Sequence, residues 1–197
     1  YESGATLTPG DPLAGLNFLA KSVSEKGIRA VDGEVYLDDR LFSTYESTGS
    51  GPANVSPIMI NDNVIDVIAE PTEVGKPAKV TTRPASARIK VDANVATVAT
   101  ETPANVRVST PTPGSIVVRG TVAMPAAGKP PYVIRIVEIE DPPSFARGAF
   151  IEALTRVGVR VNASPLSPAP SPAALPTGFP PDDAVANLTS PPFSENL

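Results

Sequence analysis

The sequence contains no cysteine, no histidine and no tryptophan among its 197 residues. These absences exclude internal disulfides, cysteine nucleophiles, Ser-His-Asp and Cys-His catalysis, and the usual His/Cys zinc sites. The longest apolar run is far shorter than the 18 or so residues of a transmembrane helix, so we expect no transmembrane segment. Catalysis, if there is any, must use serine, lysine or carboxylate groups.

Proline is the residue in excess. The chain has 24 prolines, whereas a typical share of about 5% would give roughly 10. Because each proline removes a hydrogen-bond donor and breaks a helix interior, the chain cannot be mainly a helical bundle. The hydrophobic share of 41% and the charged share of 19% are typical of a globular protein of one large or two small domains.

Charge is unevenly distributed along the chain. The formal net charge is −5, but residues 76–135 hold nine cations and two acids, a net charge of +7 that leaves −12 for the remainder. Such segregation predicts two folding units with different surfaces. The nine cations are Lys76, Lys79, Arg83, Arg88, Lys90, Arg107, Arg119, Lys129 and Arg135.

Two interpretations of this basic segment are open. It is a solvated face that complements the acidic remainder, or it is a patch that attracts an anionic polymer. We expect no nucleic-acid partner, because the cations are not interleaved with aromatic residues and no recognition motif accompanies them.

Two stretches have the same order of helix, glycine and β-branched strand. Asp11 and Asp141 each precede a proline and an apolar stripe of helical spacing, and Gly27 and Gly158 then stop the two helices. The sequence after each glycine is rich in β-branched residues. This repetition predicts a mixed sheet with flanking helices, an α/β arrangement.

The middle of the chain has a different pattern. Residues 57–68 predict two apolar strands around a turn at Asn61-Asp62-Asn63. Within the following sixty or so residues no window keeps helical periodicity, and short β-branched runs alternate with turn residues. In residues 116–122, Ile116, Val118 and Val122 share one parity. The predicted strands are Lys79–Arg83, Ala87–Val91, Val95–Ala99, Val106–Ser109, Ile116–Val122 and Tyr132–Ile139.

The predicted fold class is therefore α/β, a mixed sheet with flanking helices, interrupted by a small all-β domain. We expect residues 1–73 and 141–197 to form the discontinuous α/β domain, and residues 74–140 to form the all-β domain. The end of the first of these, residues 164–197, is a proline-rich tail that predicts a surface loop or linker.

A search for catalytic groups is negative. A serine nucleophile without histidine needs a lysine one helical turn away, yet no Ser-x-x-Lys and no Lys-Thr-Gly occurs. The Ser-x-Asn match at Ser194-Glu195-Asn196 is short enough to arise by chance. We expect this chain alone to be inactive, with no catalytic, cofactor-binding or metal-binding residues.

The paired acids fit turns and helix caps better than acid–base chemistry. These pairs are Asp38 with Asp39, Asp62 with Asp66, and Asp182 with Asp183. The second pair lacks the glycine and the distal glutamate of a calcium loop, so we expect no metal there.

Five segments, taken in order, resemble the middle of the penicillin-binding-protein-4-type D-alanyl-D-alanine carboxypeptidases, the serine peptidase S13 family. The most specific part is PIMINDNVIDV. The segments are LNFLAKSVSEKGIRAVDGEVYLDDRLF (16–42), SPIMINDNVIDVIAEP (56–71), KPAKV (76–80), DPPSFARGAFIEALTRVGV (141–159) and LTSPPFSENL (188–197).

The resemblance implies a nested architecture, in which a catalytic domain is split by a domain of sheet and helices that is itself interrupted by an all-β domain. It also implies that Ser-x-x-Lys precedes these insertions and that Ser-x-Asn and Lys-Thr-Gly follow them. On this basis the intact protein acts on peptidoglycan by acyl transfer, and this chain supplies its accessory domains. The loop 43–56 is where these domains approach substrate, although Tyr45 itself is interpreted as an ordinary surface residue.

Three hypotheses remain. The chain is the non-catalytic insertion of such a peptidase, or a standalone module that holds anionic cell-wall polymers, or a spacer that positions a catalytic domain. The first two predict an extracytoplasmic bacterial protein with no cofactor. The chain starts at Tyr1 without a basic-then-apolar leader, so we expect any signal peptide to lie outside these residues.

Overall fold

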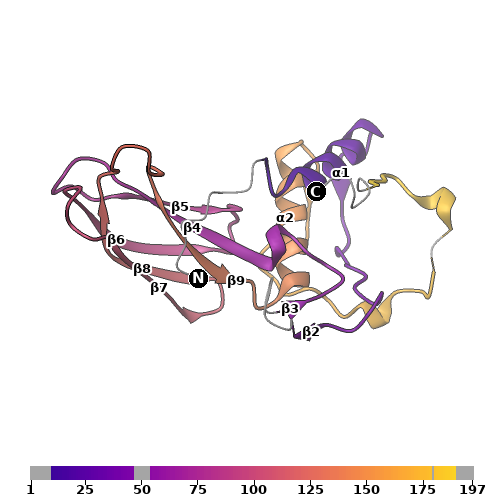
Figure 1. The fold of residues 1–197 in the computed structure, drawn as a ribbon. Helices are drawn as coiled ribbons and strands as arrows, with labels where there is room; N and C mark the ends of the chain where they lie inside the picture. Colours follow the sequence, from indigo (N-terminus) through magenta and orange to yellow (C-terminus); the bar gives the residue numbers. More distant parts are fainter. Residues whose placement is uncertain (1–9, 47–53, 179, 190–197) are drawn as a thin grey trace.

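The computed structural model describes residues 10–46, 54–178 and 180–189. Two halves lie side by side in Figure 1: a strand half, residues 64–138, and a helical half made from both ends of the chain. The helices are α1 (Ala14–Glu25) and α2 (Pro142–Arg156). The predicted α/β class with a smaller β part is confirmed.

The strand half consists of two three-stranded sheets. One has the order β5-β4-β9, with both pairs antiparallel. The other has the order β6-β8-β7, with β6 parallel and β7 antiparallel to β8. Their bounds are β4 (Val64–Glu70), β5 (Lys79–Arg83), β6 (Lys90–Val98), β7 (Asn105–Thr112), β8 (Ser115–Ala123) and β9 (Val133–Glu138).

One hydrophobic core joins the two sheets and one end of α2. The predicted parity of β8 is confirmed, because Ile116, Val118 and Val122 are all buried. Gly120 occupies the same parity, where a Cβ atom would lie 1.8 Å from the Asn105 carbonyl oxygen. The core therefore needs glycine at the point where β7 approaches most closely. Its buried members are Leu13, Ile60, Ile65, Val67, Ala69, Val95, Val106, Ile116, Val118, Val122, Ile139, Phe145, Ala146 and Ala149.

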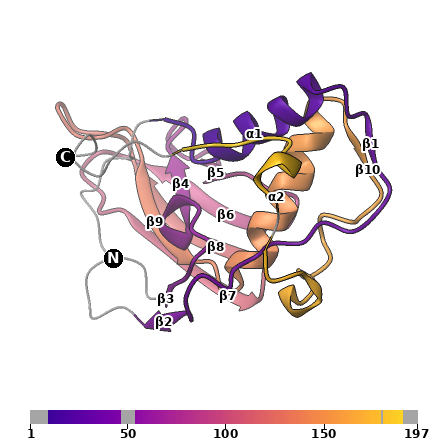
Figure 2. The same cartoon turned by 90° about the vertical axis from the view of Figure 1, so that its right-hand side faces the viewer.

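The helical half has its own small core between α1 and α2, formed by Ala20, Ala153, Leu154 and Val159. Both predicted glycine stops are confirmed by left-handed backbone, since φ is +85° at Gly27 and +82° at Gly158. The expected mixed sheet is smaller than predicted. It is a parallel pair of two-residue strands, β1 (Ala30–Val31) and β10 (Arg160–Val161), which Figure 2 shows beside α2.

Two details of the predicted strands are wrong. Residues 57–60 form no strand, because the Ser56 hydroxyl donates to the Ile58 carbonyl at 2.6 Å and bends the chain. The two strands expected at 87–91 and 95–99 are one strand, β6, which lies parallel to β8 over its whole length.

The turn before β4 is one left-handed turn, η1 (Asn61–Asn63). Its three residues have φ values of +51°, +53° and +55°. Side-chain amides hold it: Asn61 Nδ2 donates to the Val64 carbonyl at 2.9 Å, and Asn63 Oδ1 accepts from the Ile60 N–H at 3.3 Å. This turn sets the direction in which β4 enters the core.

The predicted boundary between residues 73 and 74 separates β4 from β5, although these strands pair with each other. Five consecutive residues of β4 are buried, and both strands that pair with it, β5 and β9, lie within the predicted all-β domain, residues 74–140. The strand half therefore begins at Val64. The division of the chain into two domains stays a prediction.

A small antiparallel pair, β2 (Tyr45–Glu46) and β3 (Asn54–Val55), lies apart from both sheets. Within the part of the chain that the structure describes, no helix combines the length and apolar character needed to cross a membrane.

Candidate functional site

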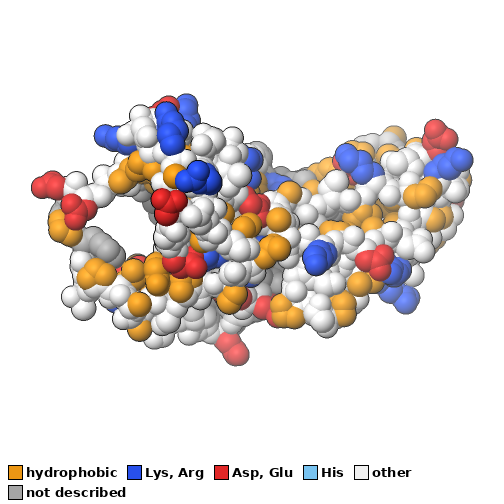
Figure 3. Space-filling view, turned by 180° about the vertical axis from the view of Figure 1, so that it is seen from behind, with side chains coloured by type: hydrophobic (Ala, Val, Ile, Leu, Met, Phe, Trp, Pro, Cys, Tyr) orange, Lys and Arg blue, Asp and Glu red, His pale blue; other side chains and the backbone are white. Residues whose placement is uncertain are grey.

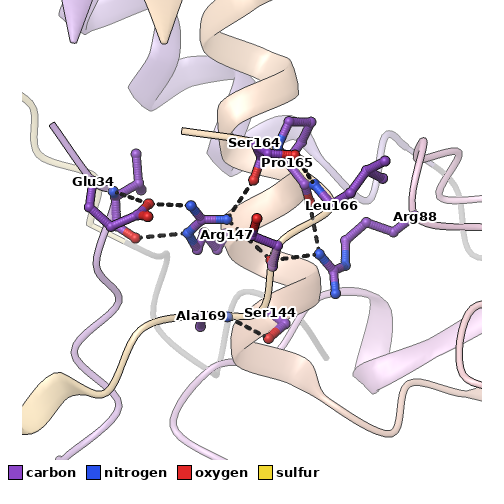
Figure 4. A network of polar contacts seen from close by, with 10 residues as sticks. Glu34, Arg88, Ser144, Arg147, Ser164, Pro165, Leu166 and Ala169 are labelled. Atoms are coloured by element: carbon purple, nitrogen blue, oxygen red, sulfur yellow. Dashed lines mark hydrogen bonds and ion pairs between the residues drawn. The ribbon is translucent and has the colours of Figure 1, made fainter. Parts of the chain in front are cut away.

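The most developed polar site surrounds the first two turns of α2 (Figure 4). The Asp141 carboxylate caps this helix by accepting the Ser144 N–H at 3.1 Å, and Pro142 and Pro143 need no partner there because they carry no N–H. Ser144 and Arg147 follow one turn apart on the same side of the helix. Their residues are 2% and 0% exposed, respectively.

Arg147 is a buried cation whose donors all point at protein oxygens. Its Nε donates to the Val35 carbonyl at 3.0 Å, and Nη1 donates to the carbonyls of Ser164 at 2.8 Å and Ser167 at 3.2 Å. Its Nη2 is paired with the Glu34 carboxylate. This hydrogen bond holds the pKa of Glu34 below its usual value. The charge is therefore neutralised and fully hydrogen-bonded, as a buried charge requires.

A second arginine reaches the same segment from the strand half. Arg88 Nη1 donates to the carbonyls of Pro165 at 2.8 Å and Ser167 at 2.9 Å, and the Ala169 N–H donates to Ser144 Oγ at 2.7 Å. Figure 4 shows both guanidinium groups turned toward this part of the proline-rich tail. Residues 164–169 are thus fastened to both halves of the molecule.

Gly148 is required by this arrangement. A Cβ atom there would lie 2.6 Å from Arg88 Cδ and 2.6 Å from the Pro165 carbonyl oxygen. Glycine therefore lets the arginine stem and the tail approach the helix surface directly.

Sequence reasoning missed this network, although one signal for it is present. Ser144 and Arg147 form a Ser-x-x-Arg pattern on a helix, the spacing that brings a serine next to a base in Ser-x-x-Lys enzymes. Arginine does not release its proton in proteins, and the Ser144 hydroxyl is buried against the tail. The pair is therefore a structural anchor and not a nucleophile with its base.

Within residues 10–46, 54–178 and 180–189, no serine hydroxyl is hydrogen-bonded to a lysine, and no group of His, Cys, Asp or Glu could hold a metal ion. The Ser-x-Asn match at 194–196 lies outside the described residues. The expectation of no catalytic residue in this chain stays a prediction.

The members of the three acid pairs lie in different local environments. Asp38 accepts two hydrogen bonds of 2.7 Å from Arg40, which lowers the pKa of Asp38 to about 2 and keeps this carboxylate ionised at neutral pH. Asp66 is paired with Arg83 at 3.4 Å. Asp62 lies in the left-handed turn, and Asp182 and Asp183 lie in a short helical turn, η3 (Pro181–Asp183).

Most cations of the basic segment make contacts within the protein. Three form ion pairs with acids: Lys79 with Glu70 at 2.8 Å, Arg83 with Asp66, and Arg119 with Asp92 at 2.6 Å. Arg88 and Arg135 donate to carbonyls, and Arg107 donates to Asn105 Oδ1. On the face in Figure 3 the basic side chains of the strand half lie apart, several of them beside acidic ones.

The loop expected to approach substrate is described only in part, because residues 47–53 lie outside the described residues. Tyr45 is 57% exposed and its ring lies 6.2 Å from that of Phe42. It contributes to no pocket wall or polar network of the described site.

Comparison with known proteins adds two solved structures and a family. Penicillin-binding protein 4 of Haemophilus influenzae in complex with a beta-lactam aligns with 86% of this chain, with 16% identity and a TM-score of 0.52. A second structure of that protein aligns with 79%, with 17% identity and a TM-score of 0.53. At such identities these likenesses concern the fold.

This chain spans 41% and 36% of the lengths of those two structures. No curated protein matches the sequence. The family model of D-Ala-D-Ala carboxypeptidase 3 matches residues 3–197, nearly the whole sequence. The chain therefore belongs to the D-Ala-D-Ala carboxypeptidase 3 (S13) family.

Proposed function

We propose that this chain is the non-catalytic accessory part of a serine-type D-Ala-D-Ala carboxypeptidase or endopeptidase that acts on peptidoglycan outside the cytoplasm. One observation carries the proposal: the family match extends over residues 3–197, yet the sequence has no Ser-x-x-Lys and no Lys-Thr-Gly. The reacting groups then belong to sequence on either side of these residues.

In the intact protein the reaction is acyl transfer. A serine attacks the carbonyl of the D-Ala-D-Ala bond, a lysine takes and returns the proton, and backbone N–H groups stabilise the oxyanion. The role of this chain is to position the rest of the protein. Arg147, Ser144 and Arg88 fix the path of residues 164–169 and hence the direction in which the chain continues from the helical half.

The domain division belongs to the same proposal. Residues 1–73 with 141–197 form the outer inserted domain and residues 74–140 form the inner one. Strand β4 (Val64–Glu70) is hydrogen-bonded to β5 and β9 of the inner domain. If the boundary is drawn by hydrogen bonds, β4 therefore belongs to the inner domain and not to the outer one.

A fluorescent penicillin tests the proposal on two samples. The 197-residue chain should show no covalent adduct by gel fluorescence and intact mass, whereas the gene product with its flanking sequence should be labelled at a serine. Labelling of the 197-residue chain would contradict the accessory role. Failure of the longer product to label would overturn the peptidase assignment.

The second candidate function is a standalone extracytoplasmic module that holds anionic cell-wall polymers through its basic segment, residues 76–135, which has a net charge of +7. Lys76, Lys90 and Lys129 are exposed, and their side chains make no hydrogen bond or ion pair with described residues. Charge reversal at these three should abolish salt-dependent pelleting with purified cell wall, while reversal at Lys21, Lys26 and Arg29 of the helical half serves as the matched control. Equal pelleting of all variants would remove this candidate.

A further inference from the structure

A pocket of about 380 Å³ lies where the two sheets meet the N-terminus of α2. Its volume is within the range of about 300–1,000 Å³ that is usual for small-molecule sites. Apolar side chains from β4, β8, β9, α2 and two adjoining loops line it, namely Ile65, Ile89, Ile116, Val137, Ile139 and Phe145. The proposed accessory role assigns no function to this pocket.

One wall of the pocket is pinned in place. Residues Thr110, Pro113 and Gly114 of the β7–β8 hairpin form this wall. Gly114 has φ +74°, and a Cβ atom there would lie 2.4 Å from the Arg88 carbonyl oxygen. Its own carbonyl accepts the Lys90 N–H at 2.8 Å. The backbone thus holds this wall in place without a ligand.

Another part of the pocket lining is acidic. Glu138, Glu140 and Asp141 lie within four consecutive residues of the lining, and all three are exposed. Asp141 is occupied as the cap of α2. Glu138 and Glu140 form no ion pair with any described residue.

The pocket offers an anion neither an unpaired cation nor a free helix N-terminus. The first N–H groups of α2 are absent at Pro142 and Pro143, and those of Ser144 and Phe145 are taken by Asp141. Arg88 is the one cation among the lining residues, but its guanidinium donates to the tail carbonyls, as Figure 4 shows. An apolar interior beside unpaired carboxylates therefore selects a ligand that combines hydrocarbon with positive charge.

We propose that this pocket binds an aliphatic primary ammonium, whose hydrocarbon chain enters the apolar interior while the ammonium lies at the Glu138–Glu140 wall. Such a group occurs in a free alkylamine and at the end of a lysine-type side chain in a peptide. The proposal stands whether or not the intact protein is a peptidase.

Titration of the 197-residue chain with n-hexylammonium, followed by heteronuclear NMR, tests the proposal. We expect saturable shifts at Ile89, Ile116 and Val137, and weaker binding of the neutral 1-hexanol and of hexanoate by about fivefold or more, the size of one favourable exposed-to-half-buried charge contact. Equal affinity for 1-hexanol, or shifts that lie elsewhere, would overturn it. Acetyl-lysine-amide against acetyl-norleucine-amide then distinguishes a peptide side chain from a free amine.

Two variants with a matched control locate the site. Glu138→Gln combined with Glu140→Gln should weaken n-hexylammonium about fivefold, whereas Glu73→Gln, an exposed acid away from the pocket, should leave affinity unchanged. Thr110→Trp places a large ring in the pocket from an exposed wall position and should abolish binding. Equal effects of the double variant and of Glu73→Gln would refute the acidic wall as the binding determinant.

Discussion

The two helices begin and end with the same sequence signals but have opposite surroundings. Each has an Asp-Pro pair near its start and stops before a glycine with positive φ. Asp141 caps α2 directly, whereas the predicted cap at Asp11 is wrong, because Leu13 is the N-cap of α1. Helix α1 buries only Ala20, whereas α2 buries ten of its residues. In Figure 2, α2 lies between α1, the strand half and the returning tail. Local signals thus fix where a helix stops, while the number of neighbours decides what its side chains must do.

The ion pair of each helix should show this difference most strongly. Arg147→Ala leaves the carbonyls of Val35, Ser164 and Ser167 without their donor and should destabilise the protein by about 3 kcal/mol. Lys21→Ala removes an exposed i,i+4 pair with Glu25 and should cost less than about 0.5 kcal/mol.

Urea unfolding followed by circular dichroism measures both changes. If the two variants lost similar amounts of unfolding free energy, the burial of α2 would contribute little to stability, and the contrast between the helices would be refuted. Arg147→Lys, which keeps the charge but loses the fork of donors, should fall between them.

The helical glycines supply the second test. Gly148→Ala puts a methyl group against Arg88 and the Pro165 carbonyl, so we expect a loss of about 1–2 kcal/mol even though alanine favours helix. Gly15→Ala in α1 meets only the side-chain end of the exposed Leu188, whose Cδ2 atom lies at 3.1 Å and can rotate away, so it should stabilise by up to about 1 kcal/mol. Thermal unfolding should move in opposite directions for the two variants; a shift of the same sign would contradict the close approach at Gly148.

Loss of the aspartate near the start of each helix is expected to give a smaller difference in stability. Asp141→Ala removes the acceptor of the Ser144 N–H and should cost about 1 kcal/mol. Asp11 accepts the Leu13 N–H at 2.9 Å in the turn before α1, whose N-cap is Leu13, so Asp11→Ala removes no helix cap and should cost about 0.5 kcal/mol. Chemical denaturation at neutral pH checks the order of the two, and a larger loss at Asp11 would reverse it.

Acidification should give the smallest change in stability, and this change should come from the ion pair that Arg147 of α2 forms with Glu34. Because Arg147 lowers the pKa of Glu34 in the folded state, Glu34 stabilises the protein above its ordinary pKa of about 4.5 and loses this contribution as pH falls through the lower folded value. Glu34→Gln should therefore flatten the loss of stability below pH 4.5 or so. Urea unfolding over an acid series checks this, with Glu101→Gln as the matched exposed control. Parallel acid profiles for wild type and Glu34→Gln would show that the ion pair contributes no pH-dependent stability.

Much of the fold could be predicted because the informative features are local. The glycine stops, the parity of β8 and the bounds of β5 all follow from residues close in sequence. The joining of two predicted strands into β6 could not, because its parallel partner β8 lies beyond a hairpin. Charge segregation likewise placed β4 with the acidic residues, while its hydrogen-bond partners lie in the predicted all-β domain, residues 74–140.

The polar site was beyond sequence reasoning for a related reason. An arginine beside an apolar stripe is normally a solvated residue, and Arg147 is buried because Glu34 and Ser164 reach it from distant parts of the chain. The run of small residues around it, Ala146, Gly148 and Ala149, is the one local sign that neighbours approach α2 on several sides.

The left-handed turn at 61–63 limits how this region can diverge among relatives. Valine or isoleucine would be strongly disfavoured at φ values near +50°, and glycine, which fits the backbone, would delete the amide contacts that Asn61 and Asn63 make. Few replacements satisfy both demands, so this short polar stretch should be among the slowest parts of the chain to change in sequence.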